Sequence, residues 1–87
     1  MADQSRSVTV GTTATKIVGL DPKRFLLLLH NNGAVTVYLG FTATDCTVAT
    51  GMPLLADVYI KFKDHAGPIY GIVSSGTCDV RVWEDKK

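Results

Sequence analysis

The apolar stretches of this chain are short, and each is closed by residues that favour turns. The run at residues 24–30 leads through an Asn-Asn-Gly turn into an alternating segment at 35–39. A second pair of runs, at 68–73 and 78–83, repeats the pattern around another glycine-containing turn. Asparagine and glycine tolerate the positive φ angles of tight hairpin turns, and valine and threonine favour extended backbone. The chain is therefore expected to form β-hairpins, since no segment shows the 3.6-residue period of an amphipathic helix.

At 87 residues the chain has the length of one domain with a thin core. Turn signals about every ten residues indicate roughly seven to eight short strands. We expect an all-β fold, an antiparallel β-sandwich or jelly-roll-like domain, over residues 8–84. The polar residues 1–7 are expected to form a flexible arm, and residues 85–87 a charged tail.

The middle of the chain contains one clear strand pattern and one loop-like segment. Residues 57–63 have the cleanest two-residue period, which places Val58, Ile60 and Phe62 on the inner face. Residues 40–53 are rich in Thr, Gly and Asp, as loops are, and contain only a short edge-strand signal at 46–48. We therefore expect a strand at 57–63 that follows a long loop.

The run at 24–30 is apolar on both of its faces. A period of two places Phe25, Leu27 and Leu29 on one face, and Leu26 and Leu28 on the other. In a two-layer sandwich the outer face of an antiparallel strand normally meets water and is polar. Leu26 and Leu28 therefore call for a loop or a neighbouring subunit to cover them, and hiding both is worth about a few kcal/mol as an upper limit.

Three aromatic residues, Tyr38, Tyr59 and Trp83, occupy positions of their strands that are expected to face outward. Exposed aromatic rings are frequent at interfaces, because they hide a large area at little cost in rotamer entropy. The same rings could stack on sugars, or be partly covered by loops of the chain itself. Together with Leu26 and Leu28, these residues are the interface candidates of the sequence.

No catalytic or metal-binding constellation is visible in the sequence. His30 and His65 stand apart from any G-x-S-x-G nucleophile motif, and the aspartates have neither calcium-loop nor paired-histidine spacing. Glycine-rich phosphate loops are missing as well. We therefore expect a protein that is not an enzyme and takes no metal, cofactor or small-molecule substrate. Cys46 and Cys78 permit one disulfide, although two reduced thiols packed as weak hydrophobes is the simpler interpretation.

Composition and charge narrow the choice of partners. Nine Lys and Arg against eight Asp and Glu give a net charge of +1, and the cations are scattered, so a nucleic-acid partner is not expected. A charge near zero and 46% hydrophobic residues fit a chain that assembles with others. No run approaches the ~20 apolar residues of a membrane helix, and the polar start of the chain is unlike a signal peptide. We expect synthesis in the cytoplasm and no membrane partner.

From about residue 23 to residue 83, the chain resembles small structural proteins found among the virion genes of tailed bacteriophages. The stretches that carry the resemblance are residues 23–29, 31–33 with 37–40, 51–54, 67–72 and 75–82. The resemblance implies a β-sandwich that decorates or cements the head of a phage particle, placed at symmetric capsid positions and often in threes. It implies no catalytic residue.

The leading hypothesis is a capsid decoration protein on the virion surface, made in the host cytoplasm, that forms a homo-oligomer, expected to be a trimer, and binds the major capsid protein. Its contact surface would be the outer face of the strand that carries Leu26 and Leu28. The alternative is a head-fibre or tail module that binds a host glycan or receptor through Tyr59, Trp83 or the loop at 41–51.

Overall fold

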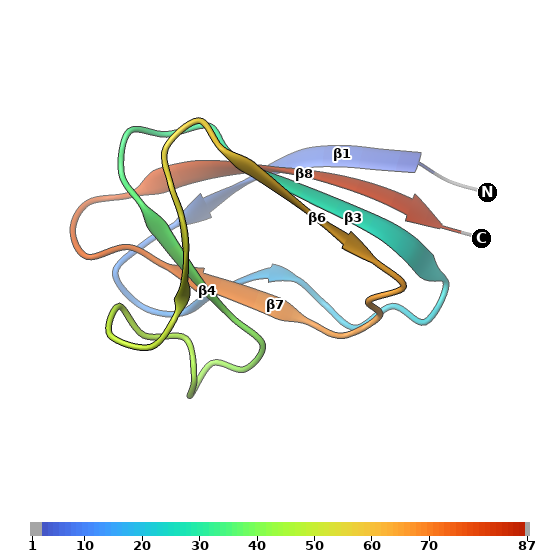
Figure 1. Cartoon of the computed structure of the whole chain (residues 1–87), viewed down its shortest axis with the longest axis horizontal. Coiled ribbons are helices and arrows are strands. Elements are labelled where there is room, and N and C mark those ends of the chain that lie inside the picture. Colours follow the sequence, from blue (N-terminus) through green and yellow to red (C-terminus); the bar gives the residue numbers. More distant parts are fainter. Residues whose placement is uncertain (1–2, 87) are drawn as a thin grey trace.

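The computed structural model describes residues 3–86, with side chains from Ser5 onward, and all of its regular elements are strands (Figure 1). Hydrophobic alternation and turn residues define them, as the sequence predicts. The strands are β1 (Asp3–Val10), β2 (Thr15–Val18), β3 (Arg24–Asn31), β4 (Val37–Gly40), β5 (Met52–Leu54), β6 (Tyr59–Lys63), β7 (Ile69–Ile72) and β8 (Cys78–Lys86).

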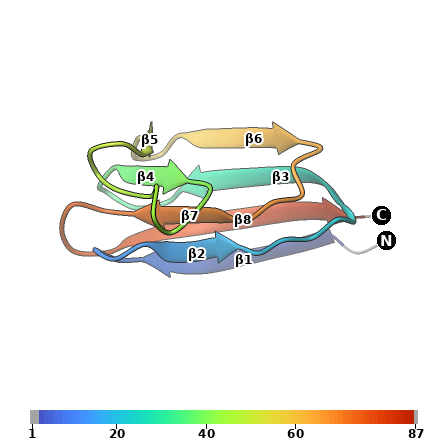
Figure 2. The ribbon, with the colours of Figure 1, turned by 90° about the horizontal axis from the view of Figure 1, so that it is seen from below.

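These strands form two antiparallel sheets of four strands each, which make the two layers seen in Figure 1. Sheet A has the order β1-β8-β3-β6, and sheet B has the order β2-β7-β4-β5. The first strand is hydrogen-bonded to the last, and the same nested pairing joins β2 with β7, β3 with β6 and β4 with β5. This is the strand order of a jelly roll, and Figure 2 shows β2, β7, β4 and β5 in front of β1, β8, β3 and β6. The predicted all-β sandwich is confirmed, but the two expected hairpins are wrong, because β3 and β8 belong to sheet A while β4 and β7 belong to sheet B.

The core lies between the sheets and is built by alternate residues of the strands. Its members are small and branched, as suits a thin sandwich. They are Val10, Ile17, Val18, Leu27, Leu29, Val37, Leu39, Leu54, Ile69, Val73, Cys78, Val80 and Val82. Gly71 allows a close approach within this core, because a Cβ atom there would lie 2.7 Å from Ile17 Cδ1 and 3.0 Å from Val37 Cγ1.

The N-terminal segment is a strand where the sequence predicts a flexible arm. Asp3 to Ser7 belong to β1 and pair with β8, in the register Asp3↔Asp85 to Ser7↔Arg81. Polar side chains are acceptable on an edge strand, and the backbone ladder orders them whatever their polarity. Residues 85 and 86 likewise continue β8 and do not form a tail. The parts of the predicted arm and tail at residues 1, 2 and 87 lie outside the described residues.

Strand β6 is shorter than predicted. It begins at Tyr59, because Asp57 has a φ of 63° and therefore cannot continue an extended strand. The turn is held by the Asp57 amide, which donates to the Asn31 carbonyl at 2.8 Å. Val58, predicted on the inner face, is 44% exposed.

The predicted edge strand at 46–48 is absent from the structure. Instead, the Cys46 amide donates to the Thr42 carbonyl at 3.1 Å, and the Gly51 amide donates to the Thr47 carbonyl at 2.7 Å, so this part of the loop is a series of turns. The strand of this region is β5, which pairs with β4. Its three residues end sheet B at the edge that faces β6.

Candidate functional site

The outer face of sheet A gathers four of the interface candidates in neighbouring rows. Leu28 lies between Trp83 of β8 and Lys61 of β6, and the next row along β3 has His30 between Arg81 and Tyr59. Directly opposite residues of an antiparallel pair share a face and touch. We call Leu26, Leu28, Tyr59 and Trp83 the outer patch.

Exposure confirms that the predicted two-faced character of β3 is real. Leu27 and Leu29 are fully buried, while Leu26 and Leu28 are only half-buried. Trp83 is 47% exposed and Tyr59 62% exposed. Within one copy of the chain, the outer patch is therefore only partly covered, which is the state expected of a contact surface before its partner binds.

Polar groups surround the outer patch, and one of them fixes the orientation of the Trp83 ring. The Trp83 indole Nε1 donates to Asp85 Oδ1 at 3.0 Å, which sets the orientation of the indole. In the neighbouring row, Arg81 pairs with Asp79 at 2.8 Å. An apolar centre with a charged rim is the usual anatomy of a protein interface.

The fifth candidate, Tyr38, lies elsewhere. Its strand β4 belongs to sheet B, where Tyr38 is opposite Pro53 on one side and Ile72 on the other. Its neighbours Val37 and Leu39 are buried, so Tyr38 occupies the outer face of sheet B. The sequence assigns it the correct outward direction but gives no means of knowing which sheet would hold it.

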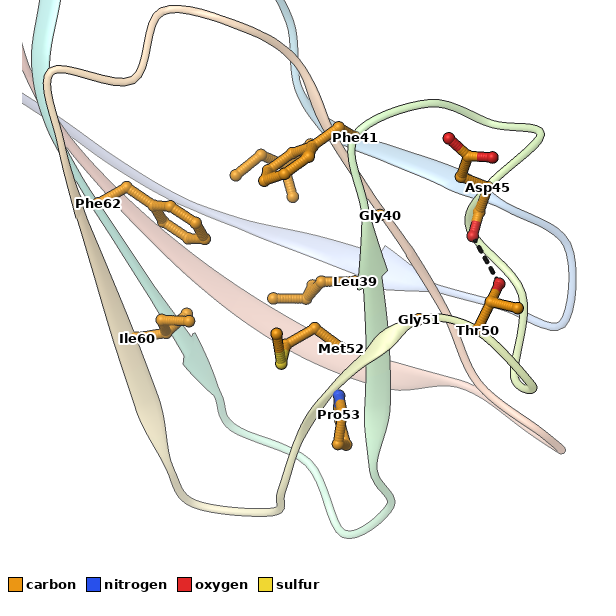
Figure 3. Close-up of a pocket in the computed structure, with 11 residues that line it drawn as sticks. Leu39, Gly40, Phe41, Asp45, Thr50, Gly51, Met52, Pro53, Ile60 and Phe62 are labelled. Atoms are coloured by element: carbon orange, nitrogen blue, oxygen red, sulfur yellow. Dashed lines mark hydrogen bonds between the residues drawn. The ribbon is translucent and has the colours of Figure 1, made fainter.

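An apolar groove of about 410 Å³ opens between β6 and the β4–β5 edge of sheet B. Figure 3 shows Ile60 and Phe62 on the β6 side and Leu39, Met52 and Pro53 on the other. We call this cavity the β5–β6 groove. The core residues Leu39 and Ile69 are among its lining residues. The groove is therefore a place where the core of the sandwich can be reached from outside.

One end of the β5–β6 groove is bordered by a stack of rings. The His65 imidazole lies 5.1 Å from the Phe41 ring and 5.6 Å from the Phe62 ring, measured between ring centroids. Phe41 is 57% exposed, although the sequence places it in phase with the inner residues Val37 and Leu39. It lies beyond the end of β4, where the strand period no longer applies.

A buried group of charges lies on the inner face of sheet A, and the sequence analysis does not identify it. Arg24 and Glu84 are each 3% exposed, and Arg24 Nη1 donates to Glu84 Oε2 at 2.9 Å. Arg24 also donates to the carbonyls of Gly19 at 3.1 Å, His65 at 3.1 Å and Gly67 at 2.6 Å. One guanidinium thus ties β8 to both loops at this end of the molecule.

Arg6 completes this group from β1. It donates to Glu84 Oε1 and, at 3.5 Å, to the carbonyl of Ile17 in sheet B. We call Arg6, Arg24 and Glu84 the ion network. It explains how a polar strand such as β1 is held against the rest of the fold.

The carboxyl group of Glu84 stays ionised inside the protein. Burial would raise its pKa, but the hydrogen bonds from Arg6 and Arg24 hold the pKa below its ordinary value of 4.5. One sequence signal for its burial exists, since Glu84 follows Val80 and Val82 in phase. The position of Arg24 has no such signal, because a β-bulge between Arg24 and Leu26 shifts it inward and leaves Phe25 half-buried.

The two cysteines are separate buried thiols, which confirms the simpler interpretation. Cys78 Sγ donates to Asn31 Oδ1 at 2.9 Å, and Cys46 Sγ donates to the Tyr38 carbonyl at 3.4 Å. Burial raises the pKa of the Cys46 thiol, so it stays protonated at neutral pH. Both thiols serve packing.

No protein-family model, curated protein or solved structure matches this chain. Among residues 3–86, no group of three or more His, Cys, Asp or Glu side chains is placed to hold a metal ion. In the same part of the chain, no helix is long and apolar enough to cross a membrane.

Proposed function

We propose that this chain is a non-enzymatic virion structural protein of the tailed-bacteriophage type, which decorates and stabilises the capsid by associating with copies of itself and with the major capsid protein. The observation that carries the proposal is the outer patch. Four apolar or aromatic side chains meet on the exposed face of a sheet: Leu26, Leu28, Tyr59 and Trp83.

The energetics favour contact over exposure for this patch. Moving a leucine or an aromatic side chain out of water contributes about 1.5–3 kcal/mol. Tyr59 is 62% and Trp83 47% exposed, while Leu26 and Leu28 are partly exposed. A few such side chains at the centre of an interface commonly supply most of its binding free energy, and Trp and Tyr are frequent among them. Repetition over many copies on a shell would add the gain of multivalency.

Binding to capsid shells tests the proposal. Purified protein is mixed with shells of the same virion that lack it, the shells are pelleted, and the bound chain is measured. Leu28→Glu places a charge at the centre of the patch and is expected to weaken binding by about a hundredfold. Ile72→Glu is the matched control, because Ile72 is also half-buried but faces outward from sheet B.

The outcomes separate clearly. Loss of binding in Leu28→Glu with retention in Ile72→Glu supports the outer patch as the contact surface. Wild-type protein that does not bind shells, or a Leu28→Glu variant that binds as the wild type does, contradicts the proposal. Circular dichroism of both variants establishes that the sandwich is folded.

One observation favours a second function, the binding of a glycan. Beside the exposed Trp83 indole there is a shallow depression lined by Ser5, Ser7 and Arg81. A flat aromatic ring with hydroxyl and guanidinium groups next to it suits stacking and hydrogen bonding to a sugar. Glycan-array binding that disappears in Trp83→Ala, together with unchanged capsid stability in particles without the chain, would favour a head-fibre or tail module.

A further inference from the structure

The loop between β2 and β3 displays Leu20, which is 74% exposed and is the most exposed of the large hydrophobic side chains in the described residues. Pro22 follows it and restricts the backbone. An exposed leucine at such a position has no role in the core of its own chain. It is therefore available to a partner.

The loop that carries Leu20 is fixed in place. The Asp21 amide donates to the Ala66 carbonyl at 2.8 Å, and the Asp21 carboxylate pairs with Lys86 at 2.9 Å. The carbonyl of Gly19 accepts from the buried Arg24 at 3.1 Å. Leu20 is thus held between two anchored residues. A side chain presented by an ordered loop loses little entropy when it binds, which makes it an effective contact.

The same chain also contains an apolar cavity that could receive such a side chain. The β5–β6 groove has a volume of about 410 Å³ and is lined by Phe41, Met52, Ile60 and Phe62, among others. A water molecule occupies about 30 Å³ of liquid, so the groove is large enough for a side chain such as leucine. Met52 is 64% exposed beside it, and no residue of the described range 3–86 fills the space.

Leu20 and the β5–β6 groove lie on opposite flanks of the sandwich. Leu20 borders a depression that it shares with Arg6 of β1 and with Glu84 and Lys86 of β8. The groove lies at the other edge of both sheets, beside β6 and β5. Leu20 can therefore enter a β5–β6 groove only when the groove belongs to another copy of the chain. Such a head-to-tail contact closes into a ring when the rotation between copies permits it.

Charge around the two features is complementary. The exposed Lys23 lies three residues after Leu20, whereas exposed Asp45 lines the groove and exposed Asp64 precedes the His65 ring at its end. The lysines of β6, Lys61 and Lys63, share the outer face of sheet A with Leu26 and Leu28, away from the groove. The cation near Leu20 and the carboxylates near the β5–β6 groove favour a contact of Leu20 with the groove over a contact between two grooves.

We propose that Leu20 of one copy inserts into the β5–β6 groove of a second copy and joins the copies head to tail. The contact uses neither Leu28 nor Trp83, so it goes beyond the function proposed above and holds whether or not the chain decorates a capsid.

Mixing two complementary variants tests the contact. Leu20→Glu removes the inserted side chain and keeps the groove, whereas Met52→Arg blocks the groove and keeps Leu20. Both residues are well exposed, so both variants should fold. Each variant alone is expected to self-associate about ten- to a hundredfold more weakly than the wild type, as judged by sedimentation velocity. An equimolar mixture has one intact contact per pair and should form a 1:1 heterodimer that goes no further.

The heterodimer is specific to the contact of Leu20 with the groove, since a contact between two like surfaces, Leu20 with Leu20 or groove with groove, cannot be restored by mixing. Leu55→Glu is the matched control, because Leu55 is 57% exposed but does not line the groove, and it should assemble as the wild type does. The inference is overturned by a wild type that is monomeric at about 100 μM, by variants that assemble unchanged, by a mixture that stays monomeric, or by a control that dissociates as well.

The shell-binding test of Leu28→Glu is separate from this one. If Leu20→Glu leaves the oligomer intact while Leu28→Glu loses shell binding, only the head-to-tail contact is wrong. If the reverse holds, the head-to-tail contact stands and the function proposed for the outer patch fails.

Discussion

The two flanks of this sandwich differ in the side chains that lie between the edges of its sheets. At the β1–β2 flank, the ion network joins the sheets, because Arg6 reaches from sheet A both to Glu84 and to the carbonyl of Ile17 in sheet B. At the β5–β6 flank, the sheets are joined by a neutral amide, since Asn31 of β3 donates to the Leu54 carbonyl of β5 at 2.9 Å, and the core residues Leu39 and Ile69 line an open apolar groove. A flank closed by charges suits a role in stability, and an open apolar flank suits a role in association.

The difference shows where the chain places its polar groups. Buried charges are tolerated only when each is paired and hydrogen-bonded, as the partners of Arg24 and Glu84 show. An apolar groove needs no partners within the chain but leaves surface that water covers poorly. We therefore expect substitutions at the first flank to change the free energy of unfolding, and substitutions at the second to change assembly.

The largest effect is expected for Arg24→Met. This change removes the donor to Glu84 and to three loop carbonyls, and it leaves the carboxylate with Arg6 alone. Breaking a buried ion pair from one side typically costs about 3–5 kcal/mol. Urea unfolding at neutral pH measures the loss. Arg81→Met is the control, since the exposed pair with Asp79 is worth about 0–1 kcal/mol, and equal losses in the two variants would contradict a special role of the ion network.

A smaller effect is expected from protonation of Glu84. Its pKa is lower in the folded protein than its ordinary value of 4.5, so the folded state is stabilised by this group above that pH. The stabilisation is lost as the pH falls through the folded pKa. Urea unfolding between pH 7 and pH 3 should therefore show a decline in the free energy of unfolding, and this decline should be smaller in Glu84→Gln.

The control for this pH effect is Asp79→Asn. Hydrogen bonds from Arg81 and Asn32 also lower the pKa of Asp79, but its side chain lies at the surface, where solvent screens the interaction. Asp79→Asn should therefore leave the decline of the unfolding free energy with falling pH almost unchanged. If Glu84→Gln instead has the pH profile of the wild type, the ion network does not contribute to acid sensitivity.

The smallest effect on stability is expected at the open flank. Met52→Ala removes a side chain that is 64% exposed, so the free energy of unfolding of the isolated chain should change by less than about 0.5 kcal/mol. Thermal unfolding of a dilute sample measures this. A loss of more than about 1 kcal/mol would mean that the groove is part of the core, and the contrast between the flanks would disappear.

Local periodicity accounts for what the sequence predicts correctly. The two-residue period of β3 separates buried Leu27 and Leu29 from half-buried Leu26 and Leu28. The turn residues correctly mark the end of β3, although the chain crosses there to sheet B and forms no hairpin. The outward direction of Trp83 and Tyr59 comes from the same alternation. These features depend only on neighbours along the chain.

Features that depend on distant partners escape prediction. Arg24 becomes a core residue because a bulge shifts the start of β3 and because its partner Glu84 lies 60 positions away. Residues 3–7 of the predicted arm are ordered by pairing with β8 at the other end of the chain. Whether Tyr38 shares a face with Trp83 depends on which sheet receives β4, and the β5–β6 groove exists only where the edges of two sheets face each other.

An electron-microscopy map of intact virions that contain this chain tests the central claim most directly, namely that the outer patch of sheet A is a contact surface. The prediction is density for the chain on the outside of the shell, with Leu28 and Trp83 buried against a neighbouring protein. A map in which that face of sheet A meets only solvent, while another face holds the chain in place, would contradict it.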